Sequence, residues 1–181
     1  MSLPNIITIA RMLAVPLIVW LIITNQMNAA FLIFVAAGIS DGVDGFIAKR
    51  FDAATTLGAY LDPLADKLLL VSIYVSLGYL DILPALLVII VVSRDVMIIG
   101  GLLLALFLER PMDIKPLFVS KANTAGQIIL AGAALGLPGL GYPSSGLIIW
   151  GSIAVGILTI GSGGIYLRDW IRHMANGSGA Q

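Results

Sequence analysis

The sequence predicts an all-α integral membrane protein with six transmembrane helices. Of its 181 residues, 59% are hydrophobic and only 11% are charged, and the mean hydropathy is +1.03. Average soluble domains carry about 25% charged residues, so this composition is typical of a chain that lies in lipid. The apolar residues gather in stretches of roughly 20, the length that a helix needs to cross the hydrocarbon core. A helix is the default there because it satisfies its own backbone hydrogen bonds.

The six helices are separated by short breaks in the apolar pattern. The first, third and fifth end at the breaks 25–28, 81–83 and 138–143, where Asn, Asp, Pro and Gly interrupt the apolar run. The second and fourth end where Lys and Arg begin, and the sixth runs on into a basic end. We expect one six-helix domain over residues 1–175 and a disordered tail over 176–181. The helices are expected at about residues 4–24, 28–49, 54–80, 84–108, 117–138 and 144–172.

The basic residues give these helices an orientation. The breaks after the odd-numbered helices contain no Lys or Arg, whereas the ends of the even-numbered helices are basic. Cytoplasmic loops of membrane proteins carry the excess of Lys and Arg, so both termini should lie on the cytoplasmic side. The same rule places them on the matrix side if the membrane is an organellar inner membrane and not a bacterial one. The residues concerned are Lys49, Arg50, Arg110, Lys115, Arg168 and Arg172.

Charged residues inside five of the helices fall at one depth. Counted from the outer end of each helix, they lie about 10 to 18 residues in, which is roughly 15–27 Å of helix rise. Ion pairs scattered through a bundle would have no reason to share a depth. We therefore expect a single polar cavity that opens toward the cytoplasm. The residues at this depth are Arg11, Asp41, Asp44, Asp62, Asp66, Arg94 and Lys121.

Four aspartates in the second and third helices form the most informative pattern. Spacings of three and four place the members of each pair on one helical face. Two such faces brought together would form an all-oxygen cage of the kind that suits Mg²⁺, Mn²⁺ or Ca²⁺. Carboxylates in hydrocarbon are costly and usually mark function, so the pattern indicates a metal-dependent enzyme that acts on a phosphate-bearing substrate. It reads Asp41-x2-Asp44-Gly45-x2-Ala48, then Gly58-x3-Asp62-x3-Asp66.

Residues 41–66 resemble the signature of the CDP-alcohol phosphatidyltransferases, D-x2-D-G-x2-A-R-x8-G-x3-D-x3-D. The one departure is Lys49, which stands where the family has arginine. A lysine offers a phosphate a point charge in place of a bidentate fork, so the departure bears on the pyrophosphate contact. The N-terminal pattern Pro4-Asn5-x2-Thr8-x2-Arg11 and the six predicted helices are also similar to this family. The resemblance therefore covers the whole chain.

The resemblance implies an enzyme that moves a phosphatidyl group from CDP-diacylglycerol to an alcohol and releases CMP. By position, Asp41, Asp44, Asp62 and Asp66 would hold two divalent cations, Mg²⁺ or Mn²⁺. Asp66 would also be the general base for the acceptor hydroxyl. The chemistry agrees, because the transfer needs a neutralised pyrophosphate and a carboxylate near the nucleophile. The residues that the resemblance places at the cytidine and pyrophosphate are Asn5, Thr8, Gly45, Ala48, Lys49 and Gly58.

Two later segments bear on the acceptor alcohol and resemble those of the eukaryotic-type cardiolipin synthases. They are Ser93-Arg94-Asp95 and Lys115-Pro116-x4-Lys121-x-Asn123-Thr124. The related phosphatidylglycerophosphate synthases usually read G-K-x-K-T in the second segment, whereas this chain has Asn123 at the second lysine position. One lysine and an amide suit a phosphodiester, so we expect phosphatidylglycerol as acceptor and cardiolipin as product. Glycerol 3-phosphate is the alternative acceptor. The residues expected at the acceptor phosphate are Arg11, Arg94, Lys115, Lys121 and Asn123.

Each of these assignments has a structural alternative. The intramembrane carboxylates can simply pair with basic residues such as Lys67. Arg94 and Asp95 can form an ion pair that touches no ligand. Asn123 can hold two helices together, and Lys115 can extend to the membrane interface.

Two other function classes fit the carboxylates less well. An intramembrane prenyltransferase needs an N-D-x2-D-x3-D cluster with a duplicate in a second half of the chain, and neither is present. A cation transporter needs pseudo-symmetric halves and polar residues that continue to the outer face, whereas the outer halves here are almost wholly apolar. The formal net charge of zero argues against a nucleic-acid partner. The small residues of the last two helices favour a homodimer, as does the family resemblance.

Overall fold

The computed structural model describes the backbone of residues 3–51, 56–107, 118–139 and 145–176, and the side chains of 10–42, 65–101, 118–138 and 146–171. These residues form six helices and no strands, so the all-α prediction is confirmed for them. Each helix matches a predicted segment to within a few residues. Asn176, which the sequence assigned to a disordered tail, is the last residue of the final helix. The helices are α1 (Leu3–Ile23), α2 (Met27–Phe51), α3 (Thr56–Tyr79), α4 (Ala85–Phe107), α5 (Phe118–Gly139) and α6 (Ser145–Asn176).

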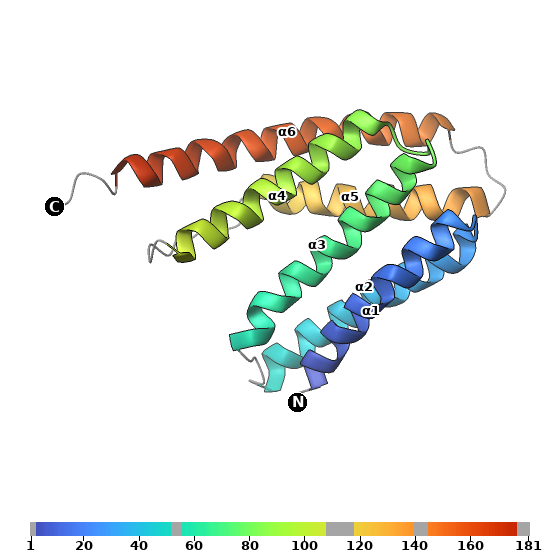
Figure 1. The fold of residues 1–181 in the computed structure, drawn as a ribbon, viewed down its shortest axis with the longest axis horizontal. Coiled ribbons are helices and arrows are strands. Elements are labelled where there is room, and N and C mark those ends of the chain that lie inside the picture. The colour runs from blue at the N-terminus through green and yellow to red at the C-terminus, as the bar shows by residue number, and fades with distance from the viewer. Residues whose placement is uncertain (1–2, 52–55, 108–117, 140–144, 177–181) are drawn as a thin grey trace.

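The helices alternate in direction along the bundle (Figure 1). The last residues of α1, α3 and α5 and the first residues of α2, α4 and α6 lie at one end, which we call the turn end. From there the helices diverge toward the opposite end, where α1 begins and α6 ends. Helix α1 packs on α2 and α3, α5 packs on α2, α3 and α6, and α4 packs on α3 and α6.

Two turns at the turn end are closed by residues in the left-handed conformation, Asn25 with φ of 63° and Asp81 with φ of 56°. Asn and Asp tolerate this conformation better than other residues with a side chain. After each of them, the next amide donates to a carbonyl five residues back, Gln26 to Leu21 at 2.8 Å and Ile82 to Leu77 at 3.0 Å. This pattern satisfies the last carbonyls of a helix, and it explains why α1 and α3 end at the predicted breaks.

The hydrophobic core lies in the half of the bundle nearest the turn end. Its most deeply buried members come from five helices, for example Ile22, Ala30, Ile73, Val91 and Leu135. Most of the buried polar and charged side chains lie farther from the turn end than most of this core. They are Arg11, Arg94, Asp95, Asn123, Gln127, Thr159 and Ser162. The fold thus separates an apolar region near the turn end from a layer of buried polar groups beyond it.

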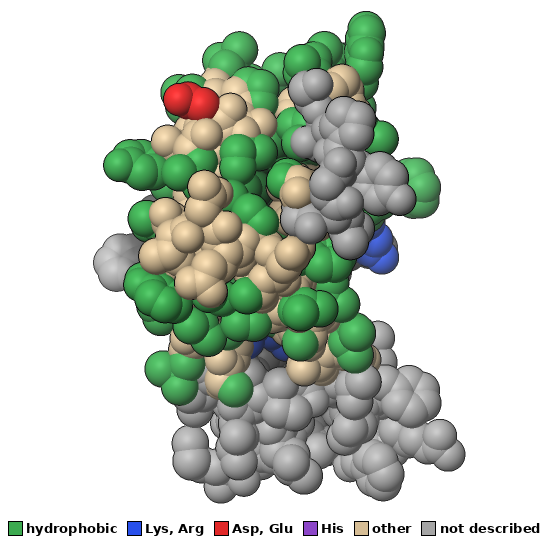
Figure 2. Space-filling model, turned by 90° about the vertical axis from the view of Figure 1, so that its right-hand side faces the viewer, with side chains coloured by type: hydrophobic (Ala, Val, Ile, Leu, Met, Phe, Trp, Pro, Cys, Tyr) green, Lys and Arg blue, Asp and Glu red, His purple; other side chains and the backbone are tan. Residues whose placement is uncertain are grey.

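The outward faces of the helices are also apolar. Large hydrophobic side chains are exposed on every helix, among them Leu13, Leu32, Val75, Ile89 and Ile157. At the turn end, hydrophobic and uncharged groups cover the described surface and few charged side chains are visible (Figure 2). By length and composition, one helix among the described residues could cross a membrane, Gly146–Ile171. Soluble proteins rarely expose so much contiguous apolar surface.

Candidate active site

The four signature aspartates lie on two helices of the bundle. Helix α2 carries Asp41 and Asp44, and helix α3 carries Asp62 and Asp66. Helix α1 packs against both of these helices. The side chains of Asp44 and Asp62 lie outside the described part of the chain, whereas those of Asp41 and Asp66 are described.

Arg11 of α1 joins the first and the last of these aspartates. Its Nη2 lies 2.7 Å from Asp41 Oδ1, and its Nη1 donates to Asp66 Oδ1. The arginine side chain is only 3% exposed, while the two aspartates are 44% and 43% exposed. A buried cation therefore holds two half-exposed carboxylates from different helices at one place.

The donor chemistry of this place fits a hard divalent cation. Mg²⁺ and Mn²⁺ prefer carboxylate oxygens, and half-exposed carboxylates can be reached by an ion from the open side. No group of three or more His, Cys, Asp or Glu side chains comes together within the described residues. Asp44 and Asp62, which would complete a set of four, lie outside them. The two described aspartates could contribute oxygens to such an ion.

A second ionic cluster lies on the other side of α3. Lys67 Nζ donates to both oxygens of Asp95, at 2.9 Å and 3.0 Å, and Arg94 Nη1 donates to Asp95 Oδ1 at 2.7 Å. Asp95 is 1% exposed, Arg94 is 4% exposed and Lys67 is 20% exposed. We call these three residues the Lys67–Asp95–Arg94 cluster. It places a buried carboxylate between two cations, which is the compensation that a charge needs away from water.

Arg94 is further engaged by two serines of other helices. Its Nη2 donates to Ser120 Oγ of α5 at 2.6 Å and to Ser162 Oγ of α6 at 2.8 Å. Gly163 leaves room for the stem of the arginine, since a Cβ there would lie 3.5 Å from Arg94 Cγ. Both terminal nitrogens of Arg94 thus have protein partners. Its Nε finds no partner among the described residues, and the sequence placed this arginine at the acceptor.

Adjacent residues of α3 take part in the two ionic clusters. Asp66 points to α1 and Lys67 to α4, and consecutive helical residues are about 100° apart around the axis. With Asp41 on α2, Ser120 on α5 and Ser162 on α6, every helix contributes a polar side chain. The layer of charges at one depth is therefore held together by two clusters that meet at α3.

The remaining predicted acceptor residues differ in their surroundings. Asn123 is fully buried, and its Oδ1 accepts a hydrogen bond from Thr159 Oγ1 at 2.8 Å, which links α5 to α6. Its Nδ2 finds no partner among the described residues. Lys121 is exposed near the start of α5, and Lys115 lies outside the described chain. The side chains of the cytidine and pyrophosphate set, Asn5, Thr8, Gly45, Ala48, Lys49 and Gly58, also lie outside it.

Sequence reasoning did not single out Ser120 and Ser162. Small hydroxyl residues are common in packed membrane helices, so neither one stands out in the sequence. Depth does not identify them either, because Ser162 and Ser120 lie 17 and 19 residues from the turn end of their helices, whereas Arg94 lies nine. Which serines face the arginine depends on how the helices are rotated, and that information comes from the structure.

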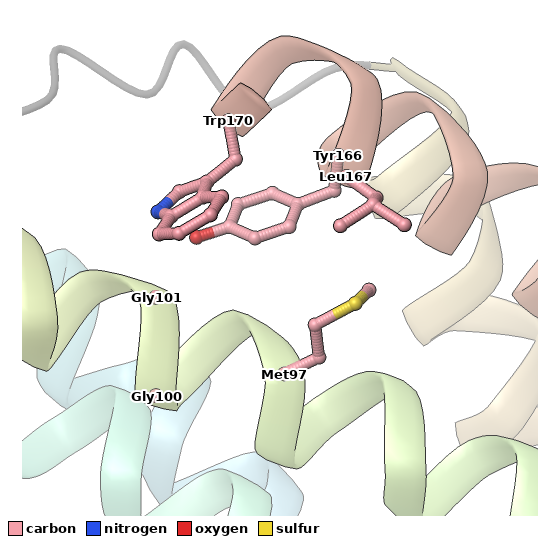
Figure 3. A pocket seen from close by; sticks show the side chains of 6 residues that line it. All are labelled: Met97, Gly100, Gly101, Tyr166, Leu167 and Trp170. Atoms are coloured by element: carbon pink, nitrogen blue, oxygen red, sulfur yellow. The ribbon is translucent and has the colours of Figure 1, made fainter. Parts of the chain in front are cut away.

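An apolar cavity of about 300 Å³ lies between α4 and α6, about one helical turn beyond Arg94 and Ser162. The rings of Tyr166 and Trp170 lie close together over Gly101, and Met97 extends toward α6 (Figure 3). The Tyr166 hydroxyl donates to the Ile98 carbonyl at 3.3 Å, which fixes the ring. Because its walls are apolar, this cavity is suited to hydrocarbon and not to the polar groups of a nucleotide. It is lined by Met97, Gly100, Gly101, Tyr166, Leu167 and Trp170.

Comparison with known proteins agrees with these features. The chain matches the family model described as CDP-alcohol phosphatidyltransferase over residues 1–158. It is 37% identical over 160 residues to the cardiolipin synthase (CMP-forming) of Homo sapiens, which covers 80% of this chain and 53% of that protein. It is 29% identical over 189 residues to the CDP-diacylglycerol--glycerol-3-phosphate 3-phosphatidyltransferase of Bacillus subtilis, covering 93% of this chain and 95% of that protein.

A chloroplastic relative from Oryza sativa, named CDP-diacylglycerol--glycerol-3-phosphate 3-phosphatidyltransferase 1, is 35% identical over 161 residues, 78% of this chain and 48% of that protein. The chain thus spans about half the length of its human and plant relatives. Proteins of the matched family generally depend on divalent metal ions. The family model covers most of the sequence, including Arg11, all four aspartates and the Lys67–Asp95–Arg94 cluster. The chain belongs to the CDP-alcohol phosphatidyltransferase family.

Proposed function

We propose that this chain transfers a phosphatidyl group from CDP-diacylglycerol to phosphatidylglycerol, which yields cardiolipin and CMP. The observation that carries the proposal is the shared contact of Asp41 and Asp66 with Arg11. It brings the first and last aspartates of the family signature to one half-exposed place. Relatives named cardiolipin synthase (CMP-forming), from Homo sapiens and Rattus norvegicus, support phosphatidylglycerol as the acceptor.

In this reaction the acceptor hydroxyl attacks the phosphorus of the phosphatidyl group, and the bond from that phosphorus to the oxygen of CMP breaks. Asp66 takes the hydroxyl proton, since a carboxylate within hydrogen-bond reach of the nucleophile can act as general base. Arg11 orients this carboxylate from the buried side. Asp41, Asp44, Asp62 and Asp66 would hold two ions, Mg²⁺ or Mn²⁺, which when bound neutralise the pyrophosphate and the leaving CMP.

We assign the acceptor and the CDP part of the donor to two different sets of residues near the four aspartates. The exposed Lys121 and the nearby Lys115 would approach the acceptor phosphate from α5. Arg94 and Asn123 are buried among protein partners, so we assign them to the support of this region. The cytidine and pyrophosphate would lie along Asn5, Thr8, Gly45, Ala48, Lys49 and Gly58.

Glycerol 3-phosphate is the second candidate acceptor. It is favoured by the Bacillus subtilis relative, which is named for that acceptor and which this chain covers almost completely. The two acceptors differ in charge, because a phosphomonoester carries nearly two negative charges and a phosphodiester carries one. Asn123 occupies the position of a second lysine and is turned toward α6, so Lys121 is the exposed lysine among the described residues of this segment. That arrangement suits the singly charged diester better.

We further propose that all six helices cross the membrane, with both termini and the active site on the cytoplasmic or matrix side. The apolar outward faces of the helices support this placement, as does the position of the buried charges in one half of the bundle. A homodimer is part of the same proposal, with the small residues of α5 and α6 as its support. A bacterial inner membrane or an organellar inner membrane would suit such a protein.

The test is CMP release by the purified full-length chain with CDP-diacylglycerol and Mg²⁺ or Mn²⁺. Phosphatidylglycerol, glycerol 3-phosphate, inositol phosphate and serine are supplied in separate reactions. We expect CMP release that depends on phosphatidylglycerol and produces cardiolipin. Release that depends on glycerol 3-phosphate would preserve the chemistry and replace the acceptor. If no acceptor gives metal-dependent CMP release, the proposal is contradicted, and a cation transporter becomes the favoured function.

A further inference from the structure

The Lys67–Asp95–Arg94 cluster has a net charge of +1, because two cations surround one carboxylate. Its members differ in how far a ligand can reach them. Asp95 and Arg94 are buried, whereas Lys67 is 20% exposed. An anion that reaches the cluster would therefore contact Lys67 and not the two buried members.

The ammonium group of Lys67 still has capacity for a ligand. A lysine Nζ carries three donors, and Asp95 accepts from it with Oδ1 and Oδ2. One N–H is left for another acceptor. Arg94 is in a different position, since it is buried and three of its five N–H groups bind Asp95 and two serines. Of the two cations, Lys67 is the one that is exposed enough for an anion to reach it.

Lys67 also lies beside the carboxylate that the proposed reaction uses as a base. It follows Asp66 directly on α3, and consecutive Cα atoms are about 3.8 Å apart. An anion bound at Lys67 would thus lie at the same level of α3 as Asp66, on a face turned about 100° from it. Both candidate acceptors carry an anionic phosphate near their reacting hydroxyl, in a diester or in a monoester.

We propose that Lys67 binds a phosphate oxygen of the acceptor substrate and that Asp95 is the positioning residue that holds it there. The proposal rests on the proposed function of the Asp66 site. A lysine side chain is flexible, and without a fixed partner Lys67 could turn toward the aspartates of the signature. The carboxylate of Asp95, held in turn by Arg94, keeps the ammonium group on the α4 side of α3.

The first test is the variant Lys67→Gln in the full-length protein. Asp95 keeps Arg94 as its cation in this variant, so no buried carboxylate is left uncompensated. The KM for phosphatidylglycerol and the KM for glycerol 3-phosphate are measured in separate series, each with the KM for CDP-diacylglycerol. We expect the KM of the acceptor used to rise about 10- to 100-fold, the range for a lost hydrogen bond to a charged group. The KM for CDP-diacylglycerol should not change, and Lys67→Arg should restore most of the acceptor affinity.

The matched control is Arg168→Gln. Arg168 is also a cation paired with an aspartate, the neighbouring Asp169, but it is exposed on α6 and belongs to neither cluster. Its replacement should leave every KM unchanged. A purely structural role for Lys67 would instead lower the thermal stability and kcat with the acceptor KM unchanged, which would overturn the proposal. A rise in the KM for CDP-diacylglycerol would overturn it as well, by assigning the lysine to the donor.

A second test measures binding without turnover. Short-chain phosphatidylglycerol, glycerol 3-phosphate and the uncharged short-chain diacylglycerol are each titrated onto the protein in the absence of CDP-diacylglycerol. In Lys67→Gln, binding of a phosphate-bearing acceptor should weaken about 10-fold or more, while diacylglycerol binding stays the same. Equal weakening of all three would contradict a phosphate contact. If Lys67→Gln does not fold, Lys67→Met, with an apolar side chain of similar length, replaces it in both tests.

The binding test also separates this inference from the proposed function. A wild-type protein that releases no CMP with any acceptor refutes the function. In that case the binding test still decides the lysine contact. Weaker binding of a phosphate-bearing acceptor to Lys67→Gln than to the wild type would support the contact, and equal binding would refute it. Activity in the wild type together with an unchanged acceptor KM and unchanged acceptor binding in Lys67→Gln refutes the lysine contact alone.

Discussion

At the scale of single residues, Arg11 has the most informative contacts in the molecule. It is buried, and its two terminal nitrogens bind carboxylates from two different helices. Guanidinium groups present several donors in a fixed plane, so one arginine can set the distance between two carboxylates. A lysine in its place would offer a single flexible point charge. The arginine therefore fixes the geometry of the signature aspartates and does more than balance their charge.

Asp66→Asn should abolish CMP release while CDP-diacylglycerol and the metal ion still bind. An amide keeps the shape of the side chain and can accept a hydrogen bond from Arg11, but it cannot act as a proton acceptor for the substrate hydroxyl. Turnover is followed by CMP release, and binding by titration with CDP-diacylglycerol in the presence of Mn²⁺. Asp81→Asn, the same change at an exposed turn residue, serves as the control and should remain active. Full activity in Asp66→Asn would exclude Asp66 as the base.

The aspartates could be predicted from the sequence, but only some of the residues around them could. The spacings of three and four identify which carboxylates share a helical face, and depth along the helices identifies Arg11 as a neighbour. The same reasoning placed Arg94 and Asn123 at the acceptor but did not predict their partners on α5 and α6, which come from the structure. The difference arises because the depth of a residue can be counted along the chain. The direction of its side chain depends on how each helix is rotated in the bundle.

At the scale of elements, residue type determines where a helix ends, and side-chain size determines how closely two helices approach. Asn25 and Asp81 adopt the left-handed conformation that ends α1 and α3, so both boundaries could be predicted from residue type. The contact between α3 and α4 depends on a residue with no side chain. A Cβ at Gly78 would lie 2.8 Å from Val88 Cγ2. Such a contact is invisible in the sequence, where Gly78 is one of 20 glycines.

Gly78→Ala should destabilise the protein by about 1–3 kcal/mol, the usual cost of extra volume in a packed interface. Val88 is branched at Cβ and has few alternative rotamers, so it cannot move aside easily. Gly38→Ala is the matched control, because a Cβ at Gly38 meets nothing within 4 Å. It should be neutral or slightly stabilising, since alanine favours a helix over glycine by up to about 1 kcal/mol. Thermal unfolding in detergent compares the two variants, and equal shifts in Tm would contradict the α3–α4 contact.

At the scale of the whole molecule, the bundle has an apolar core near the turn end and a layer of buried polar groups beyond most of that core. The core packs near the turn end, and the two ionic clusters lie toward the chain termini. Composition and positive-inside charge patterning were enough to predict six helices and the depth of the polar layer. The pairing of helices was not predictable in the same way. It depends on which faces fit one another, as when α5 packs against α2, α3 and α6 together.

The central claim is that the phosphatidyl group of CDP-diacylglycerol is transferred intact to phosphatidylglycerol at the aspartate site. The most direct measurement supplies CDP-diacylglycerol with deuterated acyl chains and unlabelled phosphatidylglycerol to the purified protein with Mg²⁺ or Mn²⁺. Mass spectrometry then follows cardiolipin and CMP together. We expect cardiolipin with one deuterated and one unlabelled phosphatidyl group, CMP in equal amount, and the loss of both on addition of EDTA. Cardiolipin without deuterium, or product formation that EDTA does not affect, would contradict the claim.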